Sequence, residues 1–305
     1  PRSSSAASDV YKRQMYNKFP GKDITEEDIK SKIPLVANFS KEPFEIAGVV
    51  FNGKKIPVMA GPNMVESEEL IIETAKSVKA SGASFLRGGA FKPLSFPYRN
   101  EKYTETGLDG LKWLKSAREE AEIPVITEVM EEKHLDAVCD ATDILQIGSR
   151  NMQNYPLIVE SAKTGFPIML KRHYGASLRD WLGAAEYALK EGCTKLILCE
   201  RGMSIPHTHR ATSRFSLDLQ VVPATQEITN IPVATDPSHA TFWRDWVEPM
   251  TLASIASGAD SIMLEVHPDP ENSAVDPLQP INFETFNSLM KKMDNVAKAV
   301  SKEVI

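Results

Sequence analysis

The 305-residue sequence predicts an α/β fold, a (β/α)8 TIM barrel, with a short N-terminal helix and a hairpin that closes the barrel floor. Eight short apolar runs end in polar residues and alternate with amphipathic stretches, at the spacing typical of this fold. The runs are continuously apolar, as expected of parallel strands that are buried on both faces. A doubly wound open sheet is the less favoured alternative, because GPNMVES rather than a G-x-G-x-x-G turn ends the first run.

The elements are expected in a regular order. Thr25 precedes EEDIKSKI and puts Asp28 at the third helical position, which is the capping box of a short helix. Asn52 and Gly53 lie between apolar runs and predict the turn of a hairpin over 49–58. The barrel strands are expected at 56–61, 84–89, 124–129, 144–148, 167–172, 195–201, 231–236 and 261–266. Helices are expected between them, for example at 68–81, 107–122, 177–192 and 249–259.

The chain divides into three parts. Residues 1–14 resemble the translation of a sequencing adapter, so we expect the natural protein to begin at Met15. Residues 15–48 form an N-terminal extension, and residues 49–305 form the catalytic barrel domain with the hairpin at its start. We expect one barrel domain, because the sequence has no internal repeat, low-complexity tract or long linker that would divide it.

Composition excludes several classes of protein. The chain is 42% hydrophobic and 25% charged, with a net charge of -6, which is ordinary for a globular enzyme but unfavourable for binding nucleic acid. Its apolar runs are too short to span a bilayer, and we expect no secretory signal. Cys139, Cys193 and Cys199 have unrelated spacings, without a zinc signature or a disulfide framework. We expect a reduced cytoplasmic protein that binds small molecules, and neither nucleic acid nor a membrane.

Charged and polar residues gather where the predicted strands end. Because these ends meet at one mouth of a barrel, their side chains should face a common space. The residues are Asn63, Arg87, Lys92, Glu128, Arg150, Lys171, Arg172, Glu200, Arg201, Asp236, His239, Glu265 and His267. Any single Arg or Lys could be a surface ion pair, but a group of buried cations is costly without an anion. The mouth is therefore expected to bind a small polyanion that carries phosphate and carboxylate groups.

A second constellation follows the last two predicted strands. His239, Glu265 and Asp276 supply an imidazole and two carboxylates, which together can hold a divalent metal, orient a water molecule or carry protons. A hydrogen-bonded structural cluster is the alternative. The three cysteines are expected to be plain core residues without a role in the reaction.

Eight strings in fixed order resemble the 3-deoxy-D-arabino-heptulosonate 7-phosphate (DAHP) synthases. They are AGPNMVES, LRGGAFKP, TEVM, LQIGSRNMQN, LKR, LCERG, DPSHAT and EVHPDPE. The match is best to the short type I branch shared with 3-deoxy-octulosonate 8-phosphate synthases. The resemblance implies a (β/α)8 barrel, a homotetramer and a step of aromatic amino-acid biosynthesis, in the shikimate pathway. The implied reaction is an aldol-type condensation of phosphoenolpyruvate with an aldose phosphate, foremost erythrose 4-phosphate, to a 3-deoxy-2-keto sugar acid and inorganic phosphate.

The resemblance also assigns roles to individual residues. Phosphoenolpyruvate would be bound by Arg87, Lys92, Arg150, Lys171 and Arg201. The catalytic set would comprise Asn63, Lys92, His239, Glu265 and Asp276. In it, Lys92 would protonate the aldehyde oxygen, and the His239 group would handle the attacking water. The aldose would lie near Pro93, Ser95 and Asp236.

The first departure from the family pattern concerns metal. Asn63 stands where metal-dependent members carry a cysteine ligand, and a neutral amide is a poor replacement for a thiolate on a soft divalent metal. We therefore expect no metal and no other cofactor. If a manganese, zinc or iron ion were retained, His239, Glu265 and Asp276 would be its ligands.

The second departure concerns the acceptor. Leu94 stands where the family has an arginine that grips the aldose phosphate, and such a charge-assisted bond contributes roughly 1.5–3 kcal/mol. His173 replaces the glycine of the usual KRG, and the stretch after Arg201 is expanded to MSIPHTHRATSR. Substitute clamps could be Arg99, His207, His209 and Arg210. Three alternatives stay open: a different aldose, a Schiff-base aldolase that uses Lys171, and a non-catalytic anion-sensing paralogue.

Overall fold

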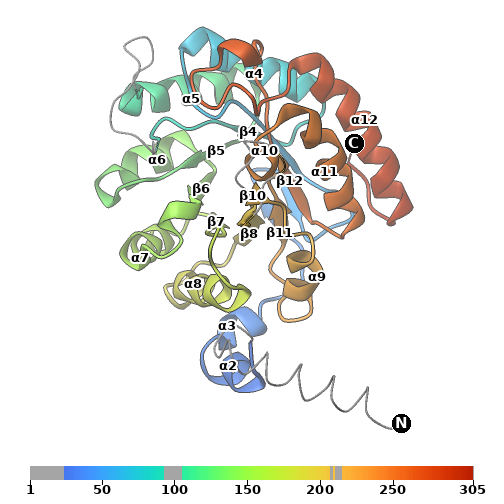
Figure 1. Ribbon diagram of the computed structural model, residues 1–305. Coiled ribbons are helices and arrows are strands. Elements are labelled where there is room, and N and C mark those ends of the chain that lie inside the picture. The colour runs from blue at the N-terminus through green and yellow to red at the C-terminus, as the bar shows by residue number, and fades with distance from the viewer. Residues whose placement is uncertain (1–23, 93–104, 207–208, 210–214, 305) are drawn as a thin grey trace, which may run out of the picture.

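Eight parallel strands close into a barrel, which confirms the predicted fold (Figure 1). The computed structural model describes residues 24–92, 105–206, 209 and 215–304. Each expected strand interval contains one barrel strand, and the last strand pairs with the first. The strands are β3 (Val58–Gly61), β4 (Phe85–Arg87), β5 (Val125–Glu128), β6 (Ile144–Ile147), β7 (Ile168–Lys171), β8 (Leu196–Glu200), β11 (Val233–Thr235) and β12 (Ser261–Glu265).

Helices form a ring around the barrel, as Figure 1 shows. They are α4 (Glu68–Ala80), α5 (Gly107–Ala121), α6 (Leu135–Ala141), α7 (Tyr155–Lys163), α8 (Leu178–Lys190), α9 (Val221–Gln226), α10 (Pro237–Thr241), α11 (Arg244–Ala256) and α12 (Phe283–Ala299). Side-chain caps fix where several of them begin: Ser67 accepts from Leu70 N before α4, and Ser177 forms a capping box with Asp180 before α8. Among the described residues, none of the helices is both long and apolar enough to cross a bilayer.

Strand side chains alternate between two hydrophobic layers. One layer fills the inside of the barrel and contains Met59, Phe85, Ile126, Ile144, Met169, Ile197, Cys199, Ala234 and Met263. The other lies between strands and helices, where Val58 and Ala60 of β3 join a cluster that includes Leu114 of α5 and Leu289 of α12. Because both faces of every barrel strand are buried, the barrel runs are continuously apolar in sequence.

The predicted hairpin is present, but its position in the sequence was wrong. It is formed by β1 (Phe44–Ile46) and β2 (Val49–Phe51), and it turns at Ala47 and Gly48 rather than at Asn52 and Gly53. Ala47 and Gly48 both have positive φ, 47° and 82°, as a two-residue hairpin turn requires. Asn52 is also left-handed, with φ of 60°, and bends the chain after β2. The hairpin therefore begins inside the stretch assigned to the N-terminal extension.

The hairpin closes the barrel floor, as predicted. Ile46 and Phe51 are buried and belong to the hydrophobic cluster inside the barrel. The Phe51 ring lies 6.0 Å from that of Phe85 and 5.7 Å from that of Phe44. Rings at these separations fill the open end with apolar area and exclude water from it.

The N-terminal helices α2 (Glu26–Ser31) and α3 (Pro34–Ala37) lie against α8. The predicted capping box of Thr25 and Asp28 is confirmed. Asp28 also accepts two bonds from Arg179 of α8, at 2.8 and 3.2 Å, and these bonds hold the pKa of its carboxyl well below the usual range. These contacts tie the extension to the barrel.

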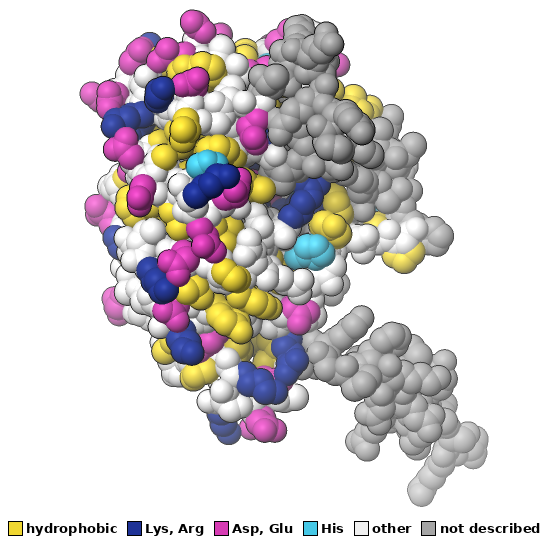
Figure 2. Space-filling model, turned by 90° about the vertical axis from the view of Figure 1, so that its left-hand side faces the viewer, with side chains coloured by type: hydrophobic (Ala, Val, Ile, Leu, Met, Phe, Trp, Pro, Cys, Tyr) yellow, Lys and Arg dark blue, Asp and Glu magenta, His cyan; other side chains and the backbone are white. Residues whose placement is uncertain are grey.

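The outer surface mixes both signs of charge. On the face turned to the viewer in Figure 2, acidic side chains lie among Lys and Arg side chains. Exposed ion pairs such as Lys163–Glu160 at 2.7 Å and Lys115–Asp140 at 2.9 Å contribute to this pattern. On this face, the described residues show no continuous basic area of the kind that binding to a phosphate backbone requires.

Candidate active site

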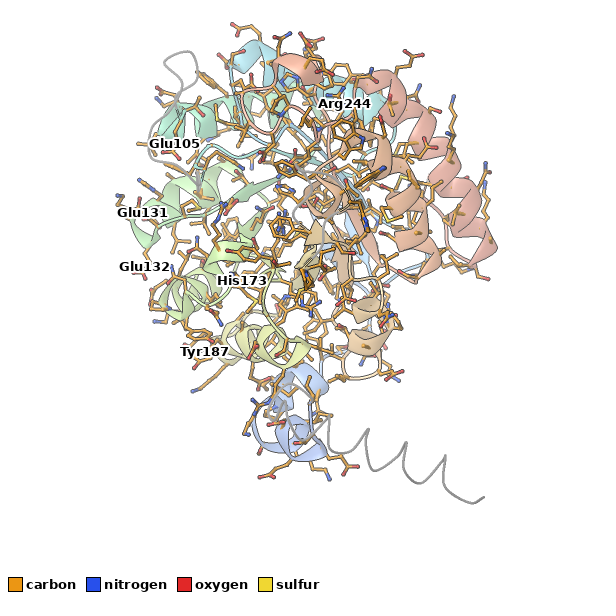
Figure 3. The ribbon with its side chains drawn as sticks, in the orientation of Figure 1. Glu105, Glu131, Glu132, His173, Tyr187 and Arg244 are labelled. Atoms are coloured by element: carbon orange, nitrogen blue, oxygen red, sulfur yellow. The ribbon has the colours of Figure 1, made fainter. Side chains whose placement is uncertain are left out.

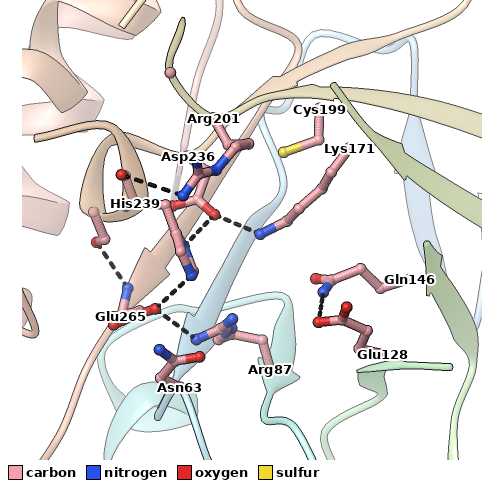
Figure 4. Close-up of polar contacts among 12 residues, drawn as sticks. Asn63, Arg87, Glu128, Gln146, Lys171, Cys199, Arg201, Asp236, His239 and Glu265 are labelled. Carbon is pink, nitrogen blue, oxygen red and sulfur yellow. Dashed lines mark hydrogen bonds and ion pairs between the residues drawn. The ribbon is translucent and has the colours of Figure 1, made fainter. Parts of the chain in front are cut away.

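The carboxyl ends of the strands bring the predicted site residues together. Figure 3 shows the side chains in the orientation of Figure 1, and Figure 4 is a close-up of the polar contacts at the mouth. Arg87, Lys171, Asp236 and Glu265 are all at most 4% exposed. Charged groups buried to this extent need partners, and the partners that each one finds define the site.

A continuous line of ionic contacts crosses the mouth (Figure 4). Lys171 Nζ lies 2.6 Å from Asp236 Oδ2, which is also 2.7 Å from His239 Nδ1. The other nitrogen of the imidazole, His239 Nε2, lies 3.1 Å from Glu265 Oε1. That carboxylate oxygen is 3.3 Å from Arg87 Nη1. We call these five residues the charge line. It joins β7, α10, β12 and β4, so four separate segments of the chain build it.

Local sequence explains the geometry around Asp236 and His239. Asp236 directly follows β11 and caps α10, where its Oδ1 accepts from His239 N at 3.1 Å. Pro237 occupies the first helical turn, where its missing N–H is tolerated. The spacing of three residues on one helical turn then brings the His239 ring beside the Asp236 carboxylate.

The charge line shifts the pKa of its members in opposite directions. Burial opposes ionisation of Asp236, but His239 and Lys171 outweigh it and hold the Asp236 pKa well below its usual range. Burial lowers the pKa of His239 well below the usual value and raises the pKa of Glu265 to about 7, against the pull of Arg87. Asp236 is therefore ionised at neutral pH, while Glu265 is poised to exchange a proton with His239.

Asn63 joins two further site residues. Its Oδ1 accepts a hydrogen bond from Lys92 Nζ, and its Nδ2 donates to Asp276 Oδ2 at 3.2 Å. Burial lowers the pKa of Lys92, partly offset by the negative charge of Glu128. A lysine with a lowered pKa gives up its proton more readily, which suits a general acid.

The predicted alternative metal ligands lie near one another, because His239 contacts Glu265 and the charge of Asp276 acts on Glu265. Within the described part of the chain, no group of three His, Cys, Asp or Glu side chains is spaced to hold a metal ion. Asp276 contacts the Asn63 amide, while His239 and Glu265 contact each other. Metal independence stays a prediction.

The predicted cations occupy three kinds of place. Arg201 is buried at the mouth, where its guanidinium lies 4.4 Å from the Phe215 ring centre and its Nη2 donates to His239 O at 3.5 Å. Arg150 lies at the rim, exposed on the turn Ser149–Asn151 after β6. Arg172 was expected at the mouth and is not there. It points to Glu200 and Asp218, at 3.1 and 2.8 Å, because alternation turns it away from the side of Lys171.

Part of the acceptor side lies outside the described residues. This applies to Pro93, Leu94, Ser95, Arg99, His207 and Arg210. Asp236, also expected near the aldose, lies between Lys171 and His239. His209 is exposed, with its ring edge-on to Trp246 at 6.3 Å.

Two clamps were not anticipated from sequence. Glu66 Oε1 lies 3.2 Å from His267 Nε2 and accepts from Ala274 N at 2.9 Å, which ties the loop of Asn63 to the loop of Asp276. Arg244, labelled in Figure 3, donates to the carbonyls of Pro277 and Pro280 at 2.6 and 2.7 Å. Glu66 and His267 stand within recognisable strings, but nothing local indicates that they pair, because 201 positions separate them.

Gln146 and Glu128 form a further buried pair inside the mouth. Gln146 Nε2 donates to Glu128 Oε2 at 3.1 Å, and both side chains are buried. A polar glutamine within the apolar run ILQIG was the available signal for Gln146. The three cysteines are free, as expected, and burial raises the pKa of Cys193 to about 11 and of Cys199 to about 12.

Comparisons with known proteins agree with this geometry. The sequence matches the model of the DAHP synthetase I family over residues 38–301. A phospho-2-dehydro-3-deoxyheptonate aldolase of Thermotoga maritima is 38% identical over 247 residues, which cover 81% of this chain and 71% of that protein. A 2-dehydro-3-deoxyphosphooctonate aldolase of Francisella tularensis subsp. mediasiatica is 26% identical over 272 residues, covering 83% of this chain and 96% of that protein.

Solved structures from Thermotoga maritima share the fold. A truncated form of its 3-deoxy-D-arabino-heptulosonate 7-phosphate synthase superposes with a TM-score of 0.79 at 34% identity, covering 88% of this chain and 99% of that chain. A crystal structure of its phospho-2-dehydro-3-deoxyheptonate aldolase gives a TM-score of 0.82 at 31% identity, covering 100% and 97%. Of the two curated relatives compared, the heptonate aldolase is the more similar in sequence.

Proposed function

Because the chain belongs to the DAHP synthetase I family, we propose that it condenses phosphoenolpyruvate with erythrose 4-phosphate to DAHP and inorganic phosphate. The observation that carries this proposal is the charge line, together with the Arg201 guanidinium beside it. Arg87, Lys171 and Arg201 are buried cations at one mouth, and an enol ester with a phosphate and a carboxylate matches them.

Phosphoenolpyruvate is held by charge. Arg87 and Arg201 offer planar guanidinium groups that bind a carboxylate or a phosphate through two parallel bonds, and Lys171 adds a point charge. Lys92 and Arg150 complete the set that the family resemblance implies. Exclusion of water from the mouth strengthens each of these attractions.

Carbon–carbon bond formation comes first in the proposed mechanism. C3 of the enol attacks the aldehyde carbon, and the electron pair of the C=O bond moves to the oxygen. Lys92 protonates that oxygen from the position where Asn63 Oδ1 holds its ammonium group. Asp276, on the other side of the Asn63 amide, keeps this amide oriented.

Water then adds at C2, which has become electron-poor. His239 and Glu265 take up the proton that the water loses, because their facing atoms, 3.1 Å apart, exchange one proton. The C2–O bond to phosphate breaks, inorganic phosphate leaves, and the remaining hydroxyl loses its proton to give the ketone. We propose that the reaction requires no metal and no other cofactor.

The test is release of inorganic phosphate from phosphoenolpyruvate, measured with erythrose 4-phosphate and with a panel of other aldoses. We expect release that depends on the aldose, is fastest with erythrose 4-phosphate and is unchanged by a chelator. Faster phosphate release with a five-carbon aldose phosphate would show that this sugar, and not erythrose 4-phosphate, is the acceptor substrate. Loss with chelator and recovery with manganese or zinc would contradict metal independence. No release with any aldose would favour the anion-sensing alternative.

The Schiff-base alternative conflicts with the surroundings of Lys171. A Schiff base requires a free amine, whereas Lys171 Nζ forms an ion pair of 2.6 Å with Asp236. Borohydride treatment in the presence of pyruvate should therefore leave the mass of the protein unchanged. A stable adduct on Lys171 would restore this alternative.

We further propose a cytoplasmic homotetramer that serves the shikimate pathway, on the basis of the family resemblance. The three free cysteines support a reducing compartment. Light scattering behind size-exclusion chromatography tests the assembly, and a monomer at micromolar concentration would contradict it.

A further inference from the structure

His173 has a position and a chemistry that the proposed mechanism leaves unused. It follows Lys171 and Arg172 on the loop after β7, at the mouth of the barrel, and Figure 3 labels it there. Its imidazole ring has two nitrogens, each of which can donate or accept a hydrogen bond.

The chain directs His173 to the same side as Lys171. Arg172 N donates to Cys199 O at 2.9 Å, which continues the ladder between β7 and β8 by one residue. Side chains alternate along such an extended segment, so Lys171 faces the mouth and Arg172 faces Glu200. His173 comes next and begins the turn that follows the strand, where Ala176 N donates to His173 O. The positive charge of Arg201, itself at the mouth, acts on His173, which agrees with this direction.

The hydrogen bonds of His173 define which nitrogen carries a proton. Gly175 N donates to His173 Nδ1 at 3.1 Å, so Nδ1 is an acceptor and the ring hydrogen is on Nε2. Burial and the charge of Arg201 lower the pKa of His173 and keep the ring neutral. The side chain is half-buried, and within the described residues Nε2–H makes no hydrogen bond. This N–H group is therefore available to water or to a bound ligand.

The ring of His173 is held in place by its neighbours. It lies 4.1 Å from the Tyr174 ring, which lies 5.4 Å from the Phe215 ring under the Arg201 guanidinium. The pairing of β9 (Met203–Ser204) with β10 (Phe215–Ser216) fixes Phe215, and Ser204 N donates to Tyr174 O at 2.8 Å. A donor that is already oriented loses little entropy when it binds a ligand.

We propose that His173 is a specificity-determining residue that binds the aldose, by donating a hydrogen bond from Nε2–H to a hydroxyl or phosphate oxygen of that substrate. This inference rests on the proposed condensation of phosphoenolpyruvate with an aldose phosphate. The ring is neutral, so it favours an oxygen acceptor without requiring a full negative charge.

The test compares two substitutions of similar size. His173→Leu removes the donor, whereas His173→Gln keeps an N–H near the position of Nε2. For His173→Leu we expect KM for erythrose 4-phosphate to rise about 3- to 10-fold, the range of one neutral hydrogen bond, with KM for phosphoenolpyruvate unchanged. His173→Gln should stay within about 2-fold of the wild type. Lys163→Met, at an exposed position of α7, is the control and should leave both KM values unchanged.

Several results would overturn the inference. An unchanged KM for the aldose in His173→Leu, an equal rise in both KM values, or a failure of His173→Gln to restore binding would each do so. Thermal melting checks that the variants fold, and if His173→Leu does not, His173→Gly takes its place with the same expected rise. If the wild type turns over no aldose, the proposed function and this inference fail together. Turnover by the wild type with no effect of His173 overturns the inference alone.

Discussion

The two ends of the barrel are built from the same eight strands and have opposite chemistry. At the floor, Ile46, Phe51 and Phe85 are fully or almost fully buried among apolar neighbours. At the mouth, Lys171 and Glu265 are buried to the same extent but are charged or titratable. The floor gains stability from every side chain that it buries, whereas each charge at the mouth loses hydration and needs a partner. The comparison indicates that the floor stabilises the barrel and leaves the mouth free for binding and chemistry.

Removing one cation from the mouth should have the largest effect. Lys171→Met leaves Asp236 with His239 alone, and we expect kcat/KM for phosphoenolpyruvate to fall by about 1000-fold. The free energy of unfolding should fall by about 3 kcal/mol, because a buried carboxylate loses its partner. Phosphate release and urea denaturation measure the two effects. The control is Lys163→Met, which breaks an exposed ion pair with Glu160 and should change neither kcat/KM nor the free energy of unfolding. If the Lys171→Met enzyme keeps its activity, Lys171 does not bind the substrate.

Shortening a side chain at the floor should lower stability and leave activity unchanged. Phe51→Ala empties the space beside Phe85 and should lower the free energy of unfolding by about 3–4 kcal/mol, while kcat and KM of the folded enzyme stay unchanged. Urea denaturation followed by kinetics at low temperature separates the two quantities. Val50→Ala, on the exposed side of the same hairpin, is the matched control and should stay within about 0.5 kcal/mol. A selective loss of activity in Phe51→Ala would show that the floor takes part in catalysis.

The pH dependence of stability should distinguish the two ends. The folded protein raises the pKa of Glu265 from 4.5 to about 7, so it holds a proton in this interval that the unfolded chain has lost. The free energy of unfolding therefore falls as pH rises through this interval, by up to about 3 kcal/mol. Glu265→Gln should remove this contribution, so its stability relative to the wild type should increase from pH 4.5 to 7.

Urea midpoints across that pH range measure the effect. Glu73→Gln changes an exposed carboxyl of α4 and should leave the wild-type pH dependence in place. If Glu265→Gln and the wild type keep a constant difference in stability over the interval, Glu265 is ionised throughout, and the proton exchange with His239 is excluded.

The smallest effect is expected at the border between the two ends. Cys199 belongs to the cluster inside the barrel, yet β7 pairs it with Lys171. Cys199→Ala should lower the free energy of unfolding by about 1 kcal/mol, with kcat and both KM values unchanged. Denaturation and steady-state kinetics measure this. A large loss of activity in Cys199→Ala would show that the site extends deeper into the barrel and that the Cys199 thiol takes part in binding or catalysis.

Much of the fold could be predicted because its signals are local. The alternation of apolar runs and amphipathic stretches predicted all eight strands, and Thr25 with Asp28 predicted a cap from four neighbouring positions. The hairpin was misplaced because two turn signals compete there. Asn-Gly at 52–53 is the stronger signal in sequence, but the chain turns at Ala47 and Gly48, which pairs Phe44 with Phe51 and directs Ile46 into the barrel.

The sequence predicted which types of residue form the site, but it did not predict which side chains pair with one another. Strand ends indicated which residues reach the mouth, but Lys171 and Arg172 are adjacent and only their alternation decides which one faces it. The partners are distant in sequence: 65 positions separate Lys171 from Asp236, and 213 separate Asn63 from Asp276. The clamps of Glu66 and Arg244 went unnoticed for the same reason.

The sequence by itself determined the barrel, the chemistry available at its mouth and the family to which the chain belongs. Those properties depend on periodicity and residue type, which neighbouring residues express without reference to the rest of the chain. The tertiary structure decided which charges pair, how the carboxyl of Glu265 is poised and which nitrogen of His173 carries its hydrogen. Pairing, burial and tautomer depend on side chains that meet only after the barrel closes, so no local pattern can specify them.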